Sequence, residues 1–133
     1  MELNILRADP AGNITVFVLD PVEKAQRAAI AEKIMAIPAL KAEQVGYACA
    51  AEDDVDGHME MMGGEFCGNA TRAYGMYIAQ QKGGLSSVRL RVSGCDHAVT
   101  AQVDLKSGTA RAEMPCPRSV KRVTVNGHEG TLV

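Results

Sequence analysis

The sequence predicts an α+β domain in which mostly antiparallel strands surround one helix, and three observations support this class. Strand-like and helical segments follow one another in the order β-β-α-β-β-α, and a run of short strands comes after them. The second helical segment is apolar almost all round, which is typical of a helix enclosed by other elements. The length of 133 residues fits one domain and is enough to bury a core, so we expect residues 1–133 to form a single domain.

Two strands are expected at the N-terminus, at residues 2–9 and 13–20, because β-branched and apolar residues dominate both. A Pro-Ala-Gly sequence between them predicts a turn.

The signals of a helix start follow the second strand. Asp20 is suited to the N-cap, Pro21 to the first helical position, and Glu23 to the acidic place of a capping box. We expect this helix to end at Pro38. Its predicted apolar stripe consists of Val22, Ala25, Ala29, Ile30, Ile34 and Ile37.

Beyond the first helix, strands are expected at 43–52 and 58–62, on either side of an acidic turn. A buried helix is expected from Gly68 to Lys82, where two glycines end it. The remaining expected strands lie at 87–94, 97–105, 108–115 and 119–127. We expect the second helix to be buried against the sheet and the first to be peripheral.

The composition excludes several classes of function. The net charge of -2 and the aromatic content of 4% argue against a nucleic-acid partner. No apolar run is long enough for a membrane span, and the N-terminus lacks the features of a signal peptide, so we expect a cytoplasmic protein. Four cysteines without a CxxC pair predict reduced thiols, no metal site and no disulfide framework.

Cys67 stands where the second helix begins, directly before Gly68 and Asn69. The first N–H groups of a helix have no internal partner and carry partial positive charge, so they stabilise a thiolate. The same groups form a natural carboxylate site, and the neighbouring glycines let a ligand approach the backbone. One short segment therefore predicts a reactive thiol beside an anion site.

The residues alone leave a second interpretation open, in which Cys67 is a small buried hydrophobe and the glycines only form a turn. For the other three cysteines a structural role is expected. Cys49 lies in an apolar strand and is expected in the core, Cys95 follows a glycine at a strand end, and Cys116 lies between two prolines.

Residues 63–73, GGEFCGNATRA, resemble the cysteine motif of the diaminopimelate epimerase superfamily, which reads Cys-Gly-Asn-Gly/Ala-x-Arg. Two weaker similarities agree in order and spacing. Residues 11–20, AGNITVFVLD, resemble the segment with a substrate-contacting asparagine, here Asn13, and residues 42–48, AEQVGYA, resemble the segment with a substrate-facing glutamine, here Gln44.

The resemblance implies a fold and a mechanism. Members have two pseudo-symmetric domains, each with antiparallel sheets wrapped around a central helix. They use two cysteines and no cofactor: one thiolate removes the α-proton of an amino acid, and the other thiol protonates the opposite face. Cys67 matches the cysteine of the first domain, which implies a catalytic role. Gly68 and Asn69 match the groups that bind the α-carboxylate.

The chain departs from the diaminopimelate enzymes before the cysteine, where His58 stands near the family's asparagine. This segment is more similar to histidine racemases, and in part to phenazine-biosynthesis isomerases. His58 is either a substrate contact or a solvent-facing turn residue. Glu65 either orients Cys67 or the substrate, or is a solvated carboxylate.

The family has about twice this length, and none of the other cysteines stands in a second motif of the same kind. We therefore expect the N-terminal domain of a cofactor-independent amino-acid racemase or epimerase, inactive without its second domain. It would be a fragment, a truncated reading frame or a half that pairs with another chain, and its exposed cleft side predicts a homo-oligomer. The alternatives are a phenazine-type isomerase, in which an acidic residue transfers the proton, and a non-catalytic domain that binds an amino acid.

Overall fold

The chain forms nine strands and two helices in the computed structural model, which describes all residues from 1 to 133. The strands of the main body are β1 (Ile5–Ala8), β2 (Thr15–Val18), β3 (Gln44–Cys49), β4 (Gly57–Met61), β5 (Ser87–Val92), β6 (Val99–Asp104) and β7 (Thr109–Ala112). The helices are α1 (Lys24–Met35) and α2 (Gly68–Gln81), and a C-terminal hairpin consists of β8 (Lys121–Val125) and β9 (His128–Leu132). The element order confirms the predicted α+β class.

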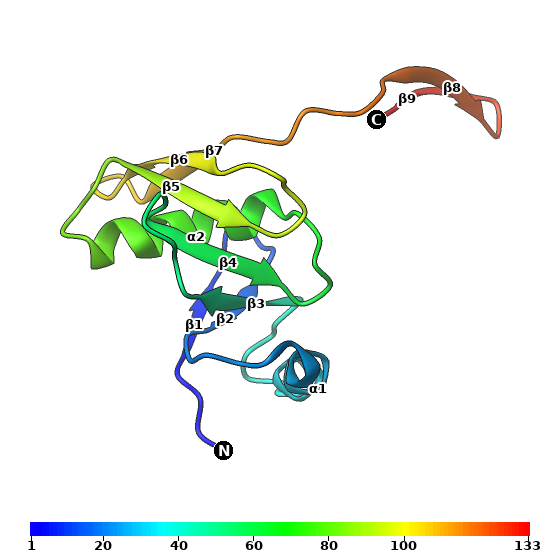
Figure 1. The fold of residues 1–133 in the computed structure, drawn as a ribbon. Coiled ribbons are helices and arrows are strands. Elements are labelled where there is room, and N and C mark those ends of the chain that lie inside the picture. Colours follow the sequence, from blue (N-terminus) through cyan, green and yellow to red (C-terminus); the bar gives the residue numbers. More distant parts are fainter.

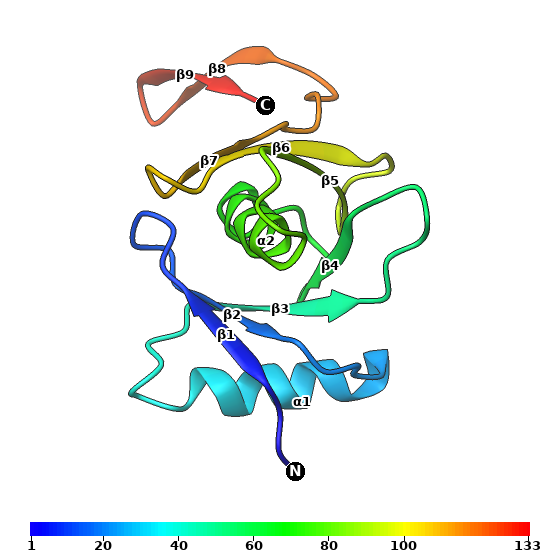
Figure 2. The same ribbon diagram turned by 90° about the vertical axis from the view of Figure 1, so that its left-hand side faces the viewer.

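The seven strands of the body form one sheet in which each strand pairs with its neighbours in sequence. Two pairs, β2–β3 and β4–β5, are parallel, and the other four pairs are antiparallel. Each parallel pair is joined by a helix, as parallel pairing requires a crossover connection. The sheet curls around α2, whereas α1 lies against the outer side of β1–β3 (Figure 2). The predicted difference between a buried and a peripheral helix is confirmed.

Strand β2 is covered on both faces, and its side chains divide between two cores. Val16 and Val18 pack with Ile30 and Ile34 of α1, whereas Phe17 packs toward α2. All four residues of this strand are buried, which explains why its sequence is a continuous apolar run and does not alternate. Because successive side chains point to opposite faces, neighbouring strands also present one set of residues to each helix.

Helix α2 lies unusually close to the sheet at Gly75. A Cβ atom at this position would stand 2.8 Å from the Cβ of Ala101 on β6, so only glycine permits the observed contact. The preceding residue, Tyr74, is buried with its ring 5.5 Å from that of Phe17. Burial raises the pKa of Tyr74 to about 12, because ionisation would place a charge inside the core.

The predicted start of the first helix is wrong by several residues. Helix α1 begins after Glu23, which makes no side-chain capping bond. The carboxylate of Asp20 instead accepts hydrogen bonds from the backbone N–H and the side-chain amide of Asn4. This long-range bond connects the N-terminal segment to the end of β2 and removes the predicted cap. The helix ends at Met35, so Ile37 lies outside it and is 46% exposed.

The hairpin β8–β9 extends away from the body and forms a separate two-stranded sheet (Figure 1). All residues of β9 are exposed, and apolar side chains of the C-terminal segment are exposed with them: Val120, Val125, Leu132 and Val133. An isolated two-stranded hairpin is marginally stable in water. Neither α1 nor α2 has the length and apolar character that crossing a membrane requires.

Candidate active site

Cys67 is the N-cap residue of α2. Its Sγ atom accepts a hydrogen bond from the backbone N–H of Ala70 at 3.4 Å, as a capping side chain does. Its carbonyl oxygen accepts from both the backbone N–H and the hydroxyl of Thr71, at 2.9 and 2.8 Å. The thiol therefore lies in the first turn of the helix, as expected from the sequence, and the residue is half-buried.

Gln44 and Asn13 lie beside this thiol although they are distant from it in sequence. The Nε2 atom of Gln44, at the start of β3, donates to Cys67 Sγ at 3.2 Å. The same nitrogen is within hydrogen-bond distance of Asn13 Oδ1 and of Thr15 Oγ1, at 3.0 and 2.7 Å. Asn13 Oδ1 is 4.0 Å from Cys67 Sγ. The parallel pairing of β2 with β3 places Thr15 opposite Gln44 and so brings these groups together.

Asn69 extends the polar network along α2. Its Nδ2 atom donates to Asn13 Oδ1 at 3.2 Å, and its Oδ1 atom accepts from the guanidinium of Arg72. Asn13 in turn donates from Nδ2 to a carboxylate oxygen of Glu43 at 2.9 Å. A continuous chain of hydrogen bonds thus runs from Arg72 through Asn69 and Asn13 to Glu43, and it fixes the amide groups around the thiol.

A cavity of about 440 Å³ adjoins the thiol of Cys67. Its walls are Phe66, Cys67, Gly68, Asn69, Arg72, Ala112 and Met114. The N–H groups of Gly68 and Asn69 begin α2 and have no hydrogen-bond partner within the chain. A Cβ atom on Gly68 would stand 3.1 Å from the sulfur of Met114, so the absence of a side chain at Gly68 keeps space free between Met114 and the helix backbone. A larger cavity, of about 530 Å³, lies between the turn after β1 and the middle of α2, and shares Arg72 as a wall.

The structure does not bring His58 to this group. His58 lies within β4 and is half-buried, so it is not the solvent-facing turn residue that one interpretation assumed. Its neighbours Gly57 and Met59 face α2, and His58 therefore points to the opposite side of the sheet. Glu65 precedes the thiol by two residues and is exposed; its carboxylate lies over Gly63, and its backbone carbonyl accepts a hydrogen bond from Ser93.

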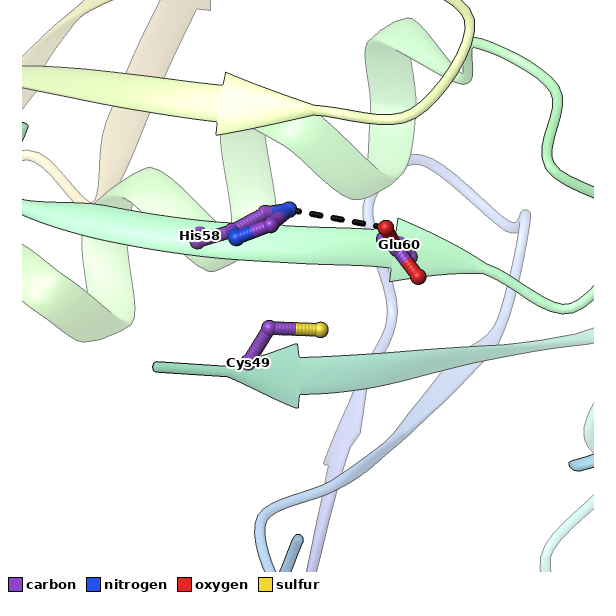
Figure 3. Close-up of side chains that lie close together, drawn as sticks. All are labelled: Cys49, His58 and Glu60. Carbon is purple, nitrogen blue, oxygen red and sulfur yellow. Dashed lines mark ion pairs between the residues drawn. The ribbon is translucent and has the colours of Figure 1, made fainter. Parts of the chain in front are cut away.

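On the outer side of the sheet, His58 gathers with Cys49 and Glu60 (Figure 3). These are types of side chain that bind metals, and their ligand atoms all lie within 4.8 Å of one another. However, the guanidinium of Arg27 pairs with Glu60 and also lies 3.5 Å from Cys49 Sγ. The Arg27 guanidinium already neutralises Glu60, the only carboxylate of the cluster, so the chemistry of this donor set does not favour a metal ion.

The pKa values of the outer cluster follow from burial and from Arg27. Burial raises the pKa of the Cys49 thiol, and the opposing effect of Arg27 does not cancel it. Burial also acts to raise the pKa of Glu60, but the hydrogen bond and charge of Arg27 outweigh it and hold the pKa below its ordinary value. Cys49 is thus a half-buried thiol on the outer side of the sheet, not a core residue as predicted.

Several residues of the site were not identified from the sequence. Thr15 and Glu43 join the network through side-chain hydrogen bonds, and Ser93 contacts the loop before Cys67. Thr15 is two residues from Asn13 and Glu43 directly precedes Gln44, so proximity to a predicted site residue was the only signal for them, and it is a weak one. Ser93 has no signal in the sequence, because only the folding of β5 beside β4 brings it there.

Residues 2–133 match the family model described as the histidine racemase CntK N-terminal domain. The chain is similar to a histidine racemase of Fusobacterium nucleatum strain ATCC 25586, with 31% identity over 140 residues that cover 98% of this chain and 50% of the relative. It is also similar to the histidine racemase of Staphylococcus aureus strain Mu50, with 32% identity over 122 residues, 89% of this chain and 44% of the relative.

A third relative, the histidine racemase of F. nucleatum strain ATCC 23726, is 29% identical over 140 residues, which cover 98% of this chain and 51% of the relative. The chain therefore spans about half the length of the curated relatives that it matches.

Proposed function

Because this chain belongs to the family of histidine racemase N-terminal domains, we propose that it supplies one half of the active site of a histidine racemase. Membership in the family confirms the sequence-based prediction of an amino-acid racemase N-terminal domain of the diaminopimelate epimerase superfamily. The proposal rests above all on one observation: the thiol of Cys67 caps α2 and adjoins a cavity beside unpaired N–H groups.

In the proposed reaction the Cys67 thiolate removes the proton from the α-carbon of the bound amino acid. The thiolate takes the proton, and the electron pair of the C–H bond passes to the carboxylate as an enediolate. Gly68 and Asn69 line the cavity, and in this proposal their unpaired N–H groups bind the carboxylate, whose negative charge increases in the transition state. The donor group of Gln44, 3.2 Å from Cys67 Sγ, stabilises the thiolate before the transfer.

Asn13 and Gln44 are proposed as polar contacts of the substrate. Both side chains are half-buried and held by several hydrogen bonds, so they have fixed orientations at the site. Glu43, bonded to Asn13, adds a carboxylate at the border of the network. A negative group at this place complements the α-ammonium of an amino acid or the imidazolium of histidine.

A second acid must come from outside residues 1–133. Inversion of a carbon centre needs a base on one face and an acid on the other, and each must be within about 3 Å of its proton. Cys49 lies on the other side of the sheet, the thiol of Cys95 contacts His97 and none of the residues around Cys67, and Cys116 is exposed beyond β7. We therefore propose a diaminopimelate epimerase-like arrangement, in which a second domain supplies the second thiol and no cofactor takes part.

The hairpin β8–β9 is consistent with a missing partner surface. Its exposed apolar side chains include Val125 at 62% and Leu132 at 56% exposure, which is unusual for a part of a finished core. We propose that the second domain covers them, and that the isolated chain covers them by self-association. Light scattering of the isolated chain tests this, and a strict monomer at high concentration contradicts the self-association.

The experiment that tests the proposed function compares the isolated chain with a form that also has the second domain. Each is incubated with L-histidine in D2O. The products are separated by chiral chromatography, and their deuterium content is measured by mass spectrometry. The two-domain form is expected to produce deuterated D-histidine, and the isolated chain is expected to produce none. D-Histidine from the isolated chain at an enzymatic rate, or none from the two-domain form, contradicts the proposal.

The similarity to histidine racemases favours this proposal over the phenazine-type isomerase considered from the sequence. In that mechanism an acidic residue transfers the proton. The only acidic side chain in the network around the cavity, Glu43, bonds to Asn13 and forms no hydrogen bond to Cys67.

A further inference from the structure

We propose that the turn formed by Ser93 and Gly94 is a positioning element that fixes the place of the Cys67 thiol. This inference rests on the proposed function for its biological meaning, but its geometry and its test do not depend on racemase activity. The turn follows β5 and is 26 to 27 residues from Cys67 in the sequence. It contacts the loop of residues 62–66, which leads from β4 to Cys67.

The hydroxyl of Ser93 connects the two ends of this loop. Its oxygen accepts a hydrogen bond from the backbone N–H of Met61 at 2.8 Å, and it donates to the carbonyl oxygen of Glu65 at 2.7 Å. The backbone N–H of Ser93 also donates to the carbonyl of Met59, at 3.1 Å. One side chain thus holds the last residue of β4 and the residue two places before the thiol. No other side chain of the structure forms a hydrogen bond to the backbone of residues 61–66.

Gly94 packs directly against the backbone of the same loop, at Glu65 and Phe66. A Cβ atom on Gly94 would stand 2.8 Å from the carbonyl carbon of Glu65 and closer still to the nitrogen of Phe66. Real Cβ atoms essentially never come within 3.0 Å of such atoms, and backbone cannot swing aside as a flexible side chain can. A side chain at this position must therefore displace the peptide that joins Glu65 to Phe66, one residue before the thiol.

A displacement there changes the surroundings of the thiol. Cys67 Sγ depends on two directional donors, the N–H of Ala70 at 3.4 Å and Nε2 of Gln44 at 3.2 Å. Hydrogen bonds weaken steeply with distance and angle, so a movement of about 1 Å removes most of the stabilisation of a thiolate. The sequence shows no sign of this dependence, because it arises only where β5 pairs with β4.

The chain offers a matched control for Gly94. Gly108, in the turn between β6 and β7, has a φ of +68°, and Gly94 has a φ of +72°. Alanine is strained at both positions for the same reason, but a Cβ on Gly108 would meet no atom within 4 Å. A comparison of Gly94→Ala with Gly108→Ala thus separates the collision with the Cys67 loop from the backbone strain.

The test measures the alkylation rate of Cys67 as a function of pH in the 133-residue chain, by brief iodoacetamide treatment and peptide mapping. Gly94→Ala is expected to lower the alkylation rate of Cys67 at neutral pH roughly tenfold and to shift the pH profile of this rate to higher pH. Gly108→Ala is expected to leave both unchanged. Ser93→Ala is expected to change the profile in the same direction, and Ser93→Thr, which keeps the hydroxyl, is expected to restore it. Thermal unfolding is followed for every variant, so that a loss of the fold is recognised.

Equal Cys67 profiles in wild type, Gly94→Ala and Ser93→Ala would overturn the inference. If Gly94→Ala does not fold, the pair of Ser93 variants decides: a profile that Ser93→Ala leaves unchanged also overturns it. The proposed function fails in a different experiment, namely if a two-domain form with Cys67→Ala still racemises histidine. In that two-domain form, Gly94→Ala is expected to lower kcat while KM stays within about twofold, since the carboxylate-binding N–H groups remain.

Discussion

Cys67 and Cys49 are both half-buried thiols with hydrogen-bond donors beside them, but the two sides of the sheet give them different surroundings. Cys67 lies on the inner side at the end of α2, where uncharged amides of Gln44 and Ala70 donate to it and a cavity adjoins it. Cys49 lies on the outer side, where the guanidinium of Arg27 stands 3.5 Å from its sulfur. Figure 3 shows this outer thiol next to His58 and Glu60.

The difference teaches that a neighbouring positive charge alone does not activate a thiol. Arg27 acts to lower the pKa of Cys49, but burial acts more strongly and the pKa is raised. Arg27 is also paired with Glu60, whose negative charge cancels much of its effect on the sulfur. At Cys67 the donors are oriented by α2 and β3 and have no competing anion at the sulfur.

The largest expected effect is the loss of catalysis without Cys67. In a two-domain form, Cys67→Ala is expected to lower the rate of histidine racemisation by roughly 10³-fold or more, because the general base is removed. Cys49→Ala is the matched control and is expected to keep a rate within about twofold of wild type. The measurement is chiral chromatography of the products. Equal losses in both variants would remove the functional distinction between the two thiols.

The second prediction concerns the ion pair beside Cys49. Glu60→Gln is expected to destabilise the fold by about 2 kcal/mol at pH 7, because Arg27 loses a charged hydrogen-bond partner and is only 15% exposed. The pKa of Glu60 is lowered in the folded state, so the stabilisation is present above the unfolded pKa and is lost as pH falls through the folded value. Urea unfolding should therefore show a difference that shrinks below about pH 4.

Glu32→Gln is the control for this experiment, since Glu32 is an exposed residue of α1 without a side-chain partner. It is expected to leave the unfolding free energy within about 0.5 kcal/mol of wild type. A difference between wild type and Glu60→Gln that stays constant from pH 7 to pH 3 would mean that the Arg27–Glu60 pair does not stabilise this side of the sheet.

A third, smaller effect is expected in the reactivity of the thiols. At neutral pH, iodoacetamide is expected to modify Cys67 about tenfold faster than Cys49, since the raised pKa of Cys49 leaves little thiolate. Peptide mapping after brief treatment gives both rates in one sample. A faster reaction at Cys49 would show that Arg27 governs its reactivity after all.

The smallest expected effect concerns Gln44. Gln44→Leu removes the donor that lies 3.2 Å from Cys67 Sγ, and one such hydrogen bond contributes about 1 kcal/mol. The alkylation rate of Cys67 should fall roughly fivefold, and the rate of Cys49 should not change. Gln26→Leu is a control at an exposed position of α1. An unchanged Cys67 rate in Gln44→Leu would show that the helix terminus alone supports the thiolate.

Much of the fold follows from local sequence patterns. The apolar run of β2, the all-round apolar character of α2 and the glycines after it predict these elements correctly, because burial and chain termination act on nearby residues. The N-terminus of α1 was wrong for the opposite reason. Asp20 has the local properties of a cap, but Asn4, distant in sequence, binds its carboxylate instead.

The sequence by itself determined the segment around Cys67, because a helix start, its free N–H groups and a thiol beside them are adjacent in the chain. It also determined that Asn13 and Gln44 belong with that segment, but only through resemblance to a family. The tertiary structure alone decided that Gln44 donates to the thiol, that His58 lies on the other side of the sheet, and that the turn of Ser93 and Gly94 supports the loop before Cys67. These contacts depend on which strands pair and which face each residue takes, and a shift of one residue in register reverses every face.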